Sequence, residues 1–413
     1  MKNKIFSLLL TLFLFWGAVG CSAGTAATEE KGNENKNPED IEEAVADIRL
    51  ETIFNGSEID LCAPELRTFL DEQDEIKQCS FLLEHEGKNY DYQEPEFFWS
   101  GEKDESFAVY FSETRDFSDA REIITDRNYF RADILQPNKT YYWKVRGMDS
   151  GLSSEIDCFD TKDAPSRILS VDGLKNVRDA GGWRTDSGKS VRYGMIYRGS
   201  QMNGYNQGAR LTERGRDTMI RDLKIKSEVD LRRPDRDDGG QTECAIDGSY
   251  PYLKAPFHPY TCIFPQFKTS ERGYDLRVPQ SFQQIFEFLA DRKNYPVYLH
   301  CNAGADRTGT ILFLLNGLLG VSYEDLTKDF EITSFSVMGK RWRADLNGNI
   351  PVEEGVMQDD EHNYVAWEKM YGMMMQYYQT ESGKLSDAIS EYLVQVCNVS
   401  VETQEAVKDI LLS

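Results

Sequence analysis

The sequence predicts a multidomain protein in which an all-β sandwich precedes an α/β domain. The length of 413 residues is enough for two or three domains of ordinary size. Short alternating apolar runs dominate residues 46–163, which is typical of half-buried antiparallel strands. A helix, an apolar strand, a tight loop and a second helix are expected in succession over residues 282–315, which is typical of an α/β layer.

The composition excludes several classes of function. Apolar residues make up 40% of the chain and aromatic residues 12%, so real hydrophobic cores are expected. The 47 basic and 70 acidic residues give a net charge of −23. Such an acidic chain is not expected to bind nucleic acid, because a phosphate backbone needs a positive field. With four histidines and no CxxC or HExxH spacing, neither a metal site nor a cofactor is expected.

The first 21 residues predict export from the cytoplasm. A basic start at Lys2 and Lys4 precedes an apolar run, and small residues then lead to Cys21. This arrangement resembles the signal of bacterial lipoproteins, which implies cleavage before Cys21 and lipidation of that residue; a plain signal peptide or an uncleaved anchor is the alternative. Residues 22–45 are small, polar and acidic, so they predict a disordered tether. The expected location is outside the cytoplasm, with the chain anchored to the cell membrane by lipid.

Residues 46–163 contain the strands of the first folded domain. Residues 107, 109 and 111 share one face of a strand, and residues 141, 143 and 145 share a face of another. Phe97 and Trp99 fit an earlier core strand. The spacing of Leu135, Pro137 and Tyr141 resembles the tyrosine corner of fibronectin type III modules, in which the tyrosine hydroxyl bonds to nearby backbone. That resemblance implies a spacer or a docking module.

The loop from Cys301 to Arg307 carries the chemistry. Cys301 ends an apolar strand and Arg307 opens the next helix, so loop N–H groups and the helix N-terminus converge on one point. Such a nest binds a phosphate dianion, and the same field favours the thiolate form of Cys301. Arg307 can hold two phosphate oxygens as a fork. The predicted phosphate-binding residues are Asn302, Ala303, Gly304, Ala305 and Thr308.

Four segments together resemble one family of enzymes. The pattern His300-Cys301, five residues and then Arg307-Thr308-Gly309 is similar to the active loop of cysteine-dependent tyrosine phosphatases. The segments NVRDAGG (176–182), MIYRGS (195–200) and VDLR (229–232) are similar to a bacterial tyrosine/serine phosphatase group. The resemblance implies a catalytic domain over residues 166–413. It also implies supporting roles, by bracing the site or acting in it, for His300, Arg178, Asp179, Arg198, Asp230 and Arg232.

The resemblance implies a two-step hydrolysis of phosphate monoesters. Cys301 would attack phosphorus, and water would then hydrolyse the cysteinyl-phosphate, with no metal required. One carboxylic acid would protonate the leaving oxygen and then activate the water. Asp306 is the expected acid, because it directly precedes Arg307 in the loop. The alternatives lie in the acidic run after residue 232, namely Asp235, Asp237 and Asp238.

Two substrate classes are open at the level of sequence. Phosphotyrosine is the expected substrate, because it needs one phosphate nest in a deep cleft. Inositol phosphates or phosphoinositides are the alternative, although Ala305 stands where group members that act on phosphoinositides tend to carry Lys. The expected partners are a phosphorylated protein or a small phosphomonoester, and the membrane through the lipid anchor.

The remaining cysteines allow disulfides, and the C-terminal third is expected to be helical. Cys62 with Cys79 and Cys244 with Cys262 are the nearest possible disulfide pairs, and buried free thiols are equally possible. Helices are expected over residues 323–331, 365–378 and 401–412.

Overall fold

The structure is a computed structural model, and residues 46–413 form one compact unit. It describes residues 48–90, 93–101, 104–132, 135–205, 208–234, 236–268, 273–337, 341 and 363–413. The predicted signal segment, the lipidation site at Cys21 and the tether over residues 22–45 lie outside the described residues.

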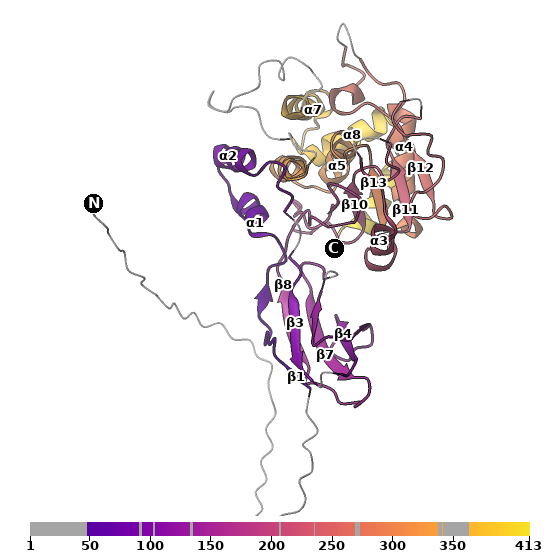
Figure 1. Cartoon of the computed structure of the whole chain (residues 1–413). Helices are drawn as coiled ribbons and strands as arrows, with labels where there is room; N and C mark the ends of the chain where they lie inside the picture. The colour runs from indigo at the N-terminus through magenta and orange to yellow at the C-terminus, as the bar shows by residue number, and fades with distance from the viewer. Residues whose placement is uncertain are drawn as a thin grey trace, which may run out of the picture. The chain divides into compact units, whose positions relative to one another are not determined.

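Eight strands in the first part of the chain form two sheets (Figure 1). The smaller sheet is antiparallel, in the order β1 (Arg49–Leu50), β3 (Glu96–Ser100), β6 (Tyr129–Arg131). The larger sheet has the order β2 (Glu58–Ile59), β8 (Asp157–Thr161), β7 (Thr140–Gly147), β4 (Phe107–Ser112), β5 (Arg121–Thr125). As the alternation predicts, Tyr141, Trp143 and Val145 are buried on one face of β7. We call these strands the β module.

Two helices interrupt the β module between β2 and β3, and the sequence analysis did not predict them. Helices α1 (Pro64–Asp71) and α2 (Glu75–His85) pack into the same core as the residues around Cys301. Phe69 of α1 is 1% exposed and meets the ring of Phe335 edge-on at 5.5 Å. Each helix buries only three residues, so its apolar repeat does not stand out in the sequence. The stretch 46–163 is therefore not entirely β.

A five-stranded mixed sheet forms the centre of the second part of the chain. Its order is β12 (Tyr252–Lys254), β11 (Ser227–Asp230), β13 (Val297–His300), β10 (Ile196–Gly199), β9 (Arg178–Asp179). Only β9 runs antiparallel to its neighbour; the other pairs are parallel. All four residues of β13 are buried, which agrees with the apolar run before Cys301. The carboxyl end of this central strand delivers Cys301.

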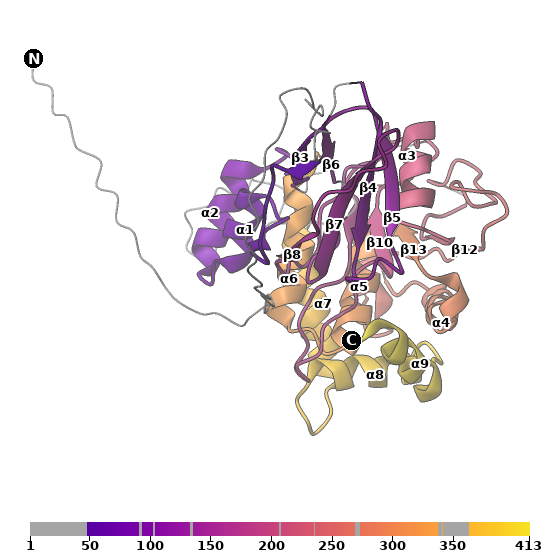
Figure 2. The same cartoon turned by 90° about the horizontal axis from the view of Figure 1, so that it is seen from below.

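Helices cover this sheet, and those predicted from the sequence are confirmed (Figures 1 and 2). The apolar helix that follows the loop is α5, which is buried from Thr308 to Leu318 and contacts α6 and α8. The helices of this part are α3 (Glu213–Asp217), α4 (Val278–Leu289), α5 (Asp306–Leu318), α6 (Tyr323–Glu331), α7 (Asn363–Tyr378), α8 (Leu385–Gln395) and α9 (Val401–Leu411). Shorter turns of helix occur at η1 (Thr218–Asp222), η2 (Tyr260–Ile263), η3 (Arg292–Asn294) and η4 (Ile332–Phe335).

Two further observations concern the described part of the chain. Seven cysteines there form no disulfide, including both pairs that lie nearest in sequence, and six of the seven are buried. Across the described ranges, no helix combines the length and the apolar character that a membrane crossing needs.

Candidate active site

The predicted nest is built where β13 ends and α5 begins. Cys301 follows His300 directly and is 2% exposed. Arg307 and Thr308 stand in the first turn of α5, where backbone N–H groups have no partner within the helix. Gly304 has a φ of +67°, and a Cβ atom there would lie 2.3 Å from the carbonyl oxygen of Gly199. Position 304 therefore requires glycine.

Every carbonyl oxygen from residue 301 to residue 305 accepts a hydrogen bond. The five donors, in order, are His300 Nδ1 at 3.0 Å, Gln201 N at 3.0 Å, Asn176 Nδ2 at 3.0 Å, Arg198 Nη2 at 2.6 Å and Gly309 N at 2.7 Å. Because the negative ends of these peptide dipoles are held by other groups, their N–H ends are left for an anion. This arrangement is what a phosphate nest needs.

The electrostatics of the nest favour a thiolate. Burial alone would raise the pKa of Cys301, but the charge of Arg307 and the polar groups of Thr308 outweigh it, so the pKa lies below the usual value for a thiol. Arg307 donates to the carbonyl oxygen of Leu231 at 3.2 Å and pairs with Asp237 at 2.7 Å. The structure thus brings together Cys301, Arg307 and Thr308, as predicted.

Asp306 lies beside the nest in an ion pair that the sequence analysis did not foresee. Arg341 donates from Nε to Oδ1 at 2.9 Å and from Nη2 to Oδ2 at 3.0 Å. The hydroxyl of Tyr260 donates to Oδ1 at 2.5 Å. Burial would raise the pKa of Asp306, but Arg341 and Tyr260 together hold it below the ordinary value. In this state Asp306 is an ionised carboxylate.

The acidic run after β11 contributes a second carboxylate near the nest. Asp237 pairs with Arg307 and accepts from Asn302 Nδ2 at 3.2 Å. Burial raises its pKa, but the hydrogen bond and charge of Arg307 bring it below the ordinary value. Asp238 instead pairs with Lys254 at 2.7 Å, and Asp235 lies outside the described residues.

The predicted supporting arginines form a buried network behind the nest. Arg198 pairs with Asp329 at 2.5 Å while it donates to the nest, and Arg178 donates to the carbonyl oxygen of Asp329 at 3.0 Å. Asp179 instead accepts from Gly181 N at 2.9 Å and Gly194 N at 2.7 Å, which fixes the turn between β9 and β10. Burial raises the pKa of Asp179. Arg198 therefore holds the loop directly, and Arg178 braces Asp329, the partner of Arg198.

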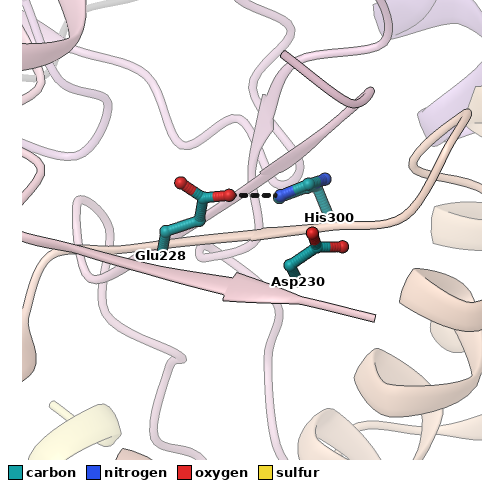
Figure 3. A group of neighbouring side chains, drawn as sticks. All are labelled: Glu228, Asp230 and His300. Atoms are coloured by element: carbon teal, nitrogen blue, oxygen red, sulfur yellow. Dashed lines mark hydrogen bonds and ion pairs between the residues drawn. The ribbon is translucent and has the colours of Figure 1, made fainter. Parts of the chain in front are cut away.

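His300 and Asp230 form a second buried cluster with Glu228 (Figure 3), and Arg232 binds this cluster. His300 Nε2 lies 2.9 Å from Glu228 Oε1. Arg232 binds both oxygens of Asp230, at 2.9 and 2.8 Å, and Lys254 binds one of them at 2.8 Å. Glu228, Asp230 and His300 lie close enough to be considered as metal ligands, but protein cations already occupy the Asp230 oxygens. The cluster is a charge network under the nest.

A cavity of about 410 Å³ opens above the nest. Cys301, Arg307 and Asp306 are among the residues that line it. Lys175, Val337 and Arg341 complete the lining. The arrangement can bind one phosphate group against a nucleophilic sulfur, with a carboxylate nearby for proton transfer.

Four residues of this site were not named individually as catalytic or supporting in the sequence analysis. Asn176 falls within the NVRDAGG segment, but Asp329, Glu228 and Tyr260 carry no local signal. Each reaches the site from a different element, so only the tertiary fold reveals its role.

Comparison with known proteins agrees with this geometry. Residues 169–413 match the model of the tyrosine phosphatase family. A tyrosine-protein phosphatase from Nostoc commune is 29% identical over 140 residues, which cover 32% of this chain and 47% of that protein. A protein of Cupriavidus necator, provisionally named a tyrosine-protein phosphatase, is 27% identical over 176 residues, which cover 39% of this chain and 61% of that protein. The alignments thus span about half of each relative.

A solved structure also shares a resemblance with this chain. It is the core catalytic domain of the PP-IP phosphatase SIW14 from S. cerevisiae in complex with citrate. The two chains are 15% identical, with a TM-score of 0.24, and the match covers 34% of this chain and 72% of the other.

Proposed function

The chain belongs to the tyrosine phosphatase family, and on that premise we propose that it hydrolyses phosphate monoesters, phosphotyrosine first. The observation that carries the proposal is the buried Cys301, which lines a cavity and whose pKa is lowered by Arg307 and Thr308. A lowered thiol pKa in a nest of N–H groups is the property that a phosphate-attacking thiolate needs.

In the first step, the Cys301 sulfur forms a bond to phosphorus as the bond from phosphorus to the leaving oxygen breaks. A carboxylic acid gives its proton to that oxygen. In the second step, water attacks the phosphorus, the carboxylate takes a proton from the water, and the S–P bond breaks to restore the thiolate and release phosphate. Arg307 and the nest amides hold the phosphate oxygens throughout.

We assign the proton transfers to Asp306, because it lines the cavity above Cys301. Its lowered pKa suits the second step, in which an ionised carboxylate accepts a proton. In the first step, the two negative charges of a bound phosphate would raise that pKa and favour the protonated form. Asp237 is the competing candidate, since it already contacts Arg307 and Asn302.

The proposal is tested with Cys301→Ser. We expect turnover of a phosphotyrosyl peptide and of p-nitrophenyl phosphate to fall to background, because a hydroxyl at this site stays protonated and cannot attack. Wild-type turnover should be unchanged by EDTA. Cys397→Ser is the matched control, since that buried thiol follows α8, does not line the cavity, and has its pKa raised to about 12 by burial. Turnover retained by Cys301→Ser would exclude the mechanism.

Inositol phosphates or phosphoinositides form the second candidate substrate class. The observation in their favour is that Lys175 and Arg341 line the cavity beside Arg307, where further phosphate groups would meet positive charge. A phosphate-release panel separates the classes: phosphotyrosyl peptides, inositol hexakisphosphate and phosphoinositide vesicles are compared at equal concentration. Higher kcat/KM on either inositol substrate would replace phosphotyrosine as the preferred substrate.

We also propose that the chain is an exported lipoprotein whose β module is a fibronectin type III-like spacer. The signal segment and Cys21 support the first part. For the second, Gln136 N donates to the Tyr141 hydroxyl at 3.0 Å at the start of β7, which is the bond expected of a tyrosine corner.

A further inference from the structure

The helices that interrupt the β module bind a segment that leads into the active site. We call residues 64–90, which carry α1 and α2, the helical insertion; it lies beside α6 (Figure 2). Gly87 N donates to the carbonyl oxygen of Ser334 at 2.9 Å. Asn89 N donates to the carbonyl oxygen of Phe335 at 2.6 Å. Both acceptors belong to η4, the turn that follows α6, so the insertion holds the backbone of that turn.

Aromatic side chains of the insertion also pack around Phe335. The rings of Phe69 and Tyr90 meet its ring edge-on at 5.5 Å, and the ring of Phe81 meets it edge-on at 6.3 Å. Phe335 is fully buried. Because edge-on aromatic contacts add to the energy of burial, a shift of η4 would break up a closely packed cluster.

The same turn holds the residue that pairs with Asp306. Ser334 is fully buried, and its Oγ accepts a hydrogen bond from Arg341 N at 2.9 Å. The guanidinium of Arg341 reaches both carboxylate oxygens of Asp306, as described above. Ser334 thus joins the insertion, which binds its carbonyl oxygen, to the ion pair at the cavity.

We propose that Ser334 is a positioning residue for the proton transfers of Asp306. Its hydroxyl fixes the backbone of Arg341 beside Asp306, and the helical insertion fixes Ser334. A part of the chain that the sequence predicts to be a spacer or a docking module then also shapes the active site. The consequence for turnover rests on the proposed phosphatase function, whereas the fixing of Arg341 does not.

The effect on chemistry follows from what Arg341 does for Asp306. Two parallel hydrogen bonds orient the carboxylate, and Arg341 is the strongest group that opposes the effect of burial on its pKa. If the backbone at Arg341 loosens, the carboxylate is less well aimed at the leaving oxygen and its pKa rises. The other titratable groups around Asp306, which a change at Ser334 leaves in place, are Tyr260 on η2, Arg307 on α5, Cys301 after β13 and Lys175 in the cavity lining.

The first test observes Arg341 directly and needs no turnover. Hydrogen exchange of its backbone amide and its Nε–H is measured by NMR in protein labelled with ¹⁵N-arginine, and Arg341→Lys assigns the two signals. We expect both to exchange about tenfold faster in Ser334→Ala, because a buried hydrogen bond is lost. Ser281→Ala is the matched control, since it removes another buried hydroxyl, one that donates to Pro256 and does not line the cavity. Exchange at the wild-type rate in Ser334→Ala would overturn the proposal.

The second test compares two leaving groups. We expect Ser334→Ala to lower kcat about tenfold with a phosphotyrosyl peptide and much less with p-nitrophenyl phosphate, because only the first leaving oxygen needs a proton. The alkaline limb of kcat with the peptide should move up by about one pH unit, because an acid of higher pKa stays protonated to higher pH. Ser281→Ala should match wild type in both respects. Equal losses on the two substrates with an unmoved limb would mean that Ser334 serves the fold alone, which would overturn the proposal.

The third test leaves Ser334 intact, so it covers the case in which Ser334→Ala does not fold. Tyr90→Ala loosens η4 from the side of the insertion, and we expect about threefold lower kcat with the peptide. In an Arg341→Gln background the same change should have no further effect, because the ion pair through which it acts is already lost. Equal fold losses in the two backgrounds would contradict a route through Arg341 and overturn the proposal.

Exchange and turnover together separate this inference from the proposed function. A wild type that hydrolyses no phosphate monoester, with faster exchange at Arg341 in Ser334→Ala, would reject the function and leave the positioning of Arg341 by Ser334. Normal hydrolysis, with unchanged exchange in Ser334→Ala, would reject the positioning role alone.

Discussion

Asp306 occupies the position at which one carboxyl group can serve both chemical steps, yet its contacts favour only one of them. Arg341 and Tyr260 hold it ionised, which suits a base. A bound phosphate dianion reverses that balance by adding negative charge on the other side. The protonation state of Asp306 therefore depends on whether substrate is bound. Substrates whose leaving groups differ in their need for a proton can reveal its role.

We expect Asp306→Asn to lower kcat about 10²–10⁴-fold with a phosphotyrosyl peptide, whose leaving oxygen needs a proton. The loss with p-nitrophenyl phosphate should be much smaller, because nitrophenolate leaves without a proton. Asp237→Asn is the matched comparison: it frees Arg307 from a competing carboxylate, so KM should fall. The opposite pattern, in which only Asp237→Asn loses the peptide substrate, would move the acid to Asp237.

Tyr260 allows a prediction about pH. Its hydroxyl lowers the pKa of Asp306, so Tyr260→Phe should raise that pKa. An acid is protonated below its pKa, so the alkaline limb of kcat with the peptide substrate should move upward by about one pH unit. Tyr295→Phe, which removes a hydroxyl bonded to Leu289 away from the site, should leave the limb in place. An unmoved limb in Tyr260→Phe would argue that Asp306 is not the acid.

At the level of single residues, the sequence predicts which residues of one segment lie together, but it does not predict contacts between segments that are far apart in the chain. Cys301, Arg307 and Thr308 were predictable, because one loop and one helix start place them together. Glu228, Tyr260 and Asp329 were not, because each comes from another element. Arg341 was not predictable either, since no pattern in the sequence pairs it with Asp306.

Among the elements, the least expected contribution comes from α1 and α2. Both leave the β module and bury apolar side chains in the core that contains Cys301. Lys328 on α6 donates to the carbonyl oxygen of Leu70 at 2.8 Å and ends α1 with a charged donor. By contrast, α4 and α5 were predictable, because α4 follows an amphipathic repeat over 12 residues and α5 is an apolar run of 13 residues. Helices α6, α7 and α9 were expected as well.

We expect Phe69→Ala to destabilise the chain by about 3–5 kcal/mol, because it opens a cavity in a fully packed site. Urea unfolding followed by fluorescence measures the change. Ile76→Ala on the neighbouring helix removes an exposed side chain and should cost no more than about 0.5 kcal/mol. Equal effects of the two changes would mean that α1 does not stabilise the core.

At the scale of the whole molecule, the net charge bears on how the chain attaches to a membrane. A chain with a charge of −23 gains nothing from an anionic lipid surface, so we propose that a covalent lipid supplies its membrane attachment. The sequence predicts that lipid at Cys21, outside the part that the structure describes. The fold class of the second part was predictable from its strand–loop–helix frame, whereas the insertion of α1 and α2 was not.

We therefore expect Cys21→Ser to move the chain from the membrane fraction to the soluble fraction of the producing bacterium, with kcat unchanged. Ser22→Ala, one residue along, should stay with the membrane. Immunoblots of the two fractions measure the change. A Cys21→Ser chain that remains membrane-bound without detergent would contradict lipid anchoring.

The path of the chain through α1 and α2 has a consequence for how the molecule comes apart. The backbone leaves the β module after β2, returns to it at β3 and leaves again after β8. When a protease cuts one of these connections, the two fragments stay together by packing. The helices α1 and α2 remain in the core around Cys301, and the strands of the β module remain paired. The two fragments should therefore separate only in denaturant, and the cleaved protein should elute from a size-exclusion column at the volume of the uncleaved protein.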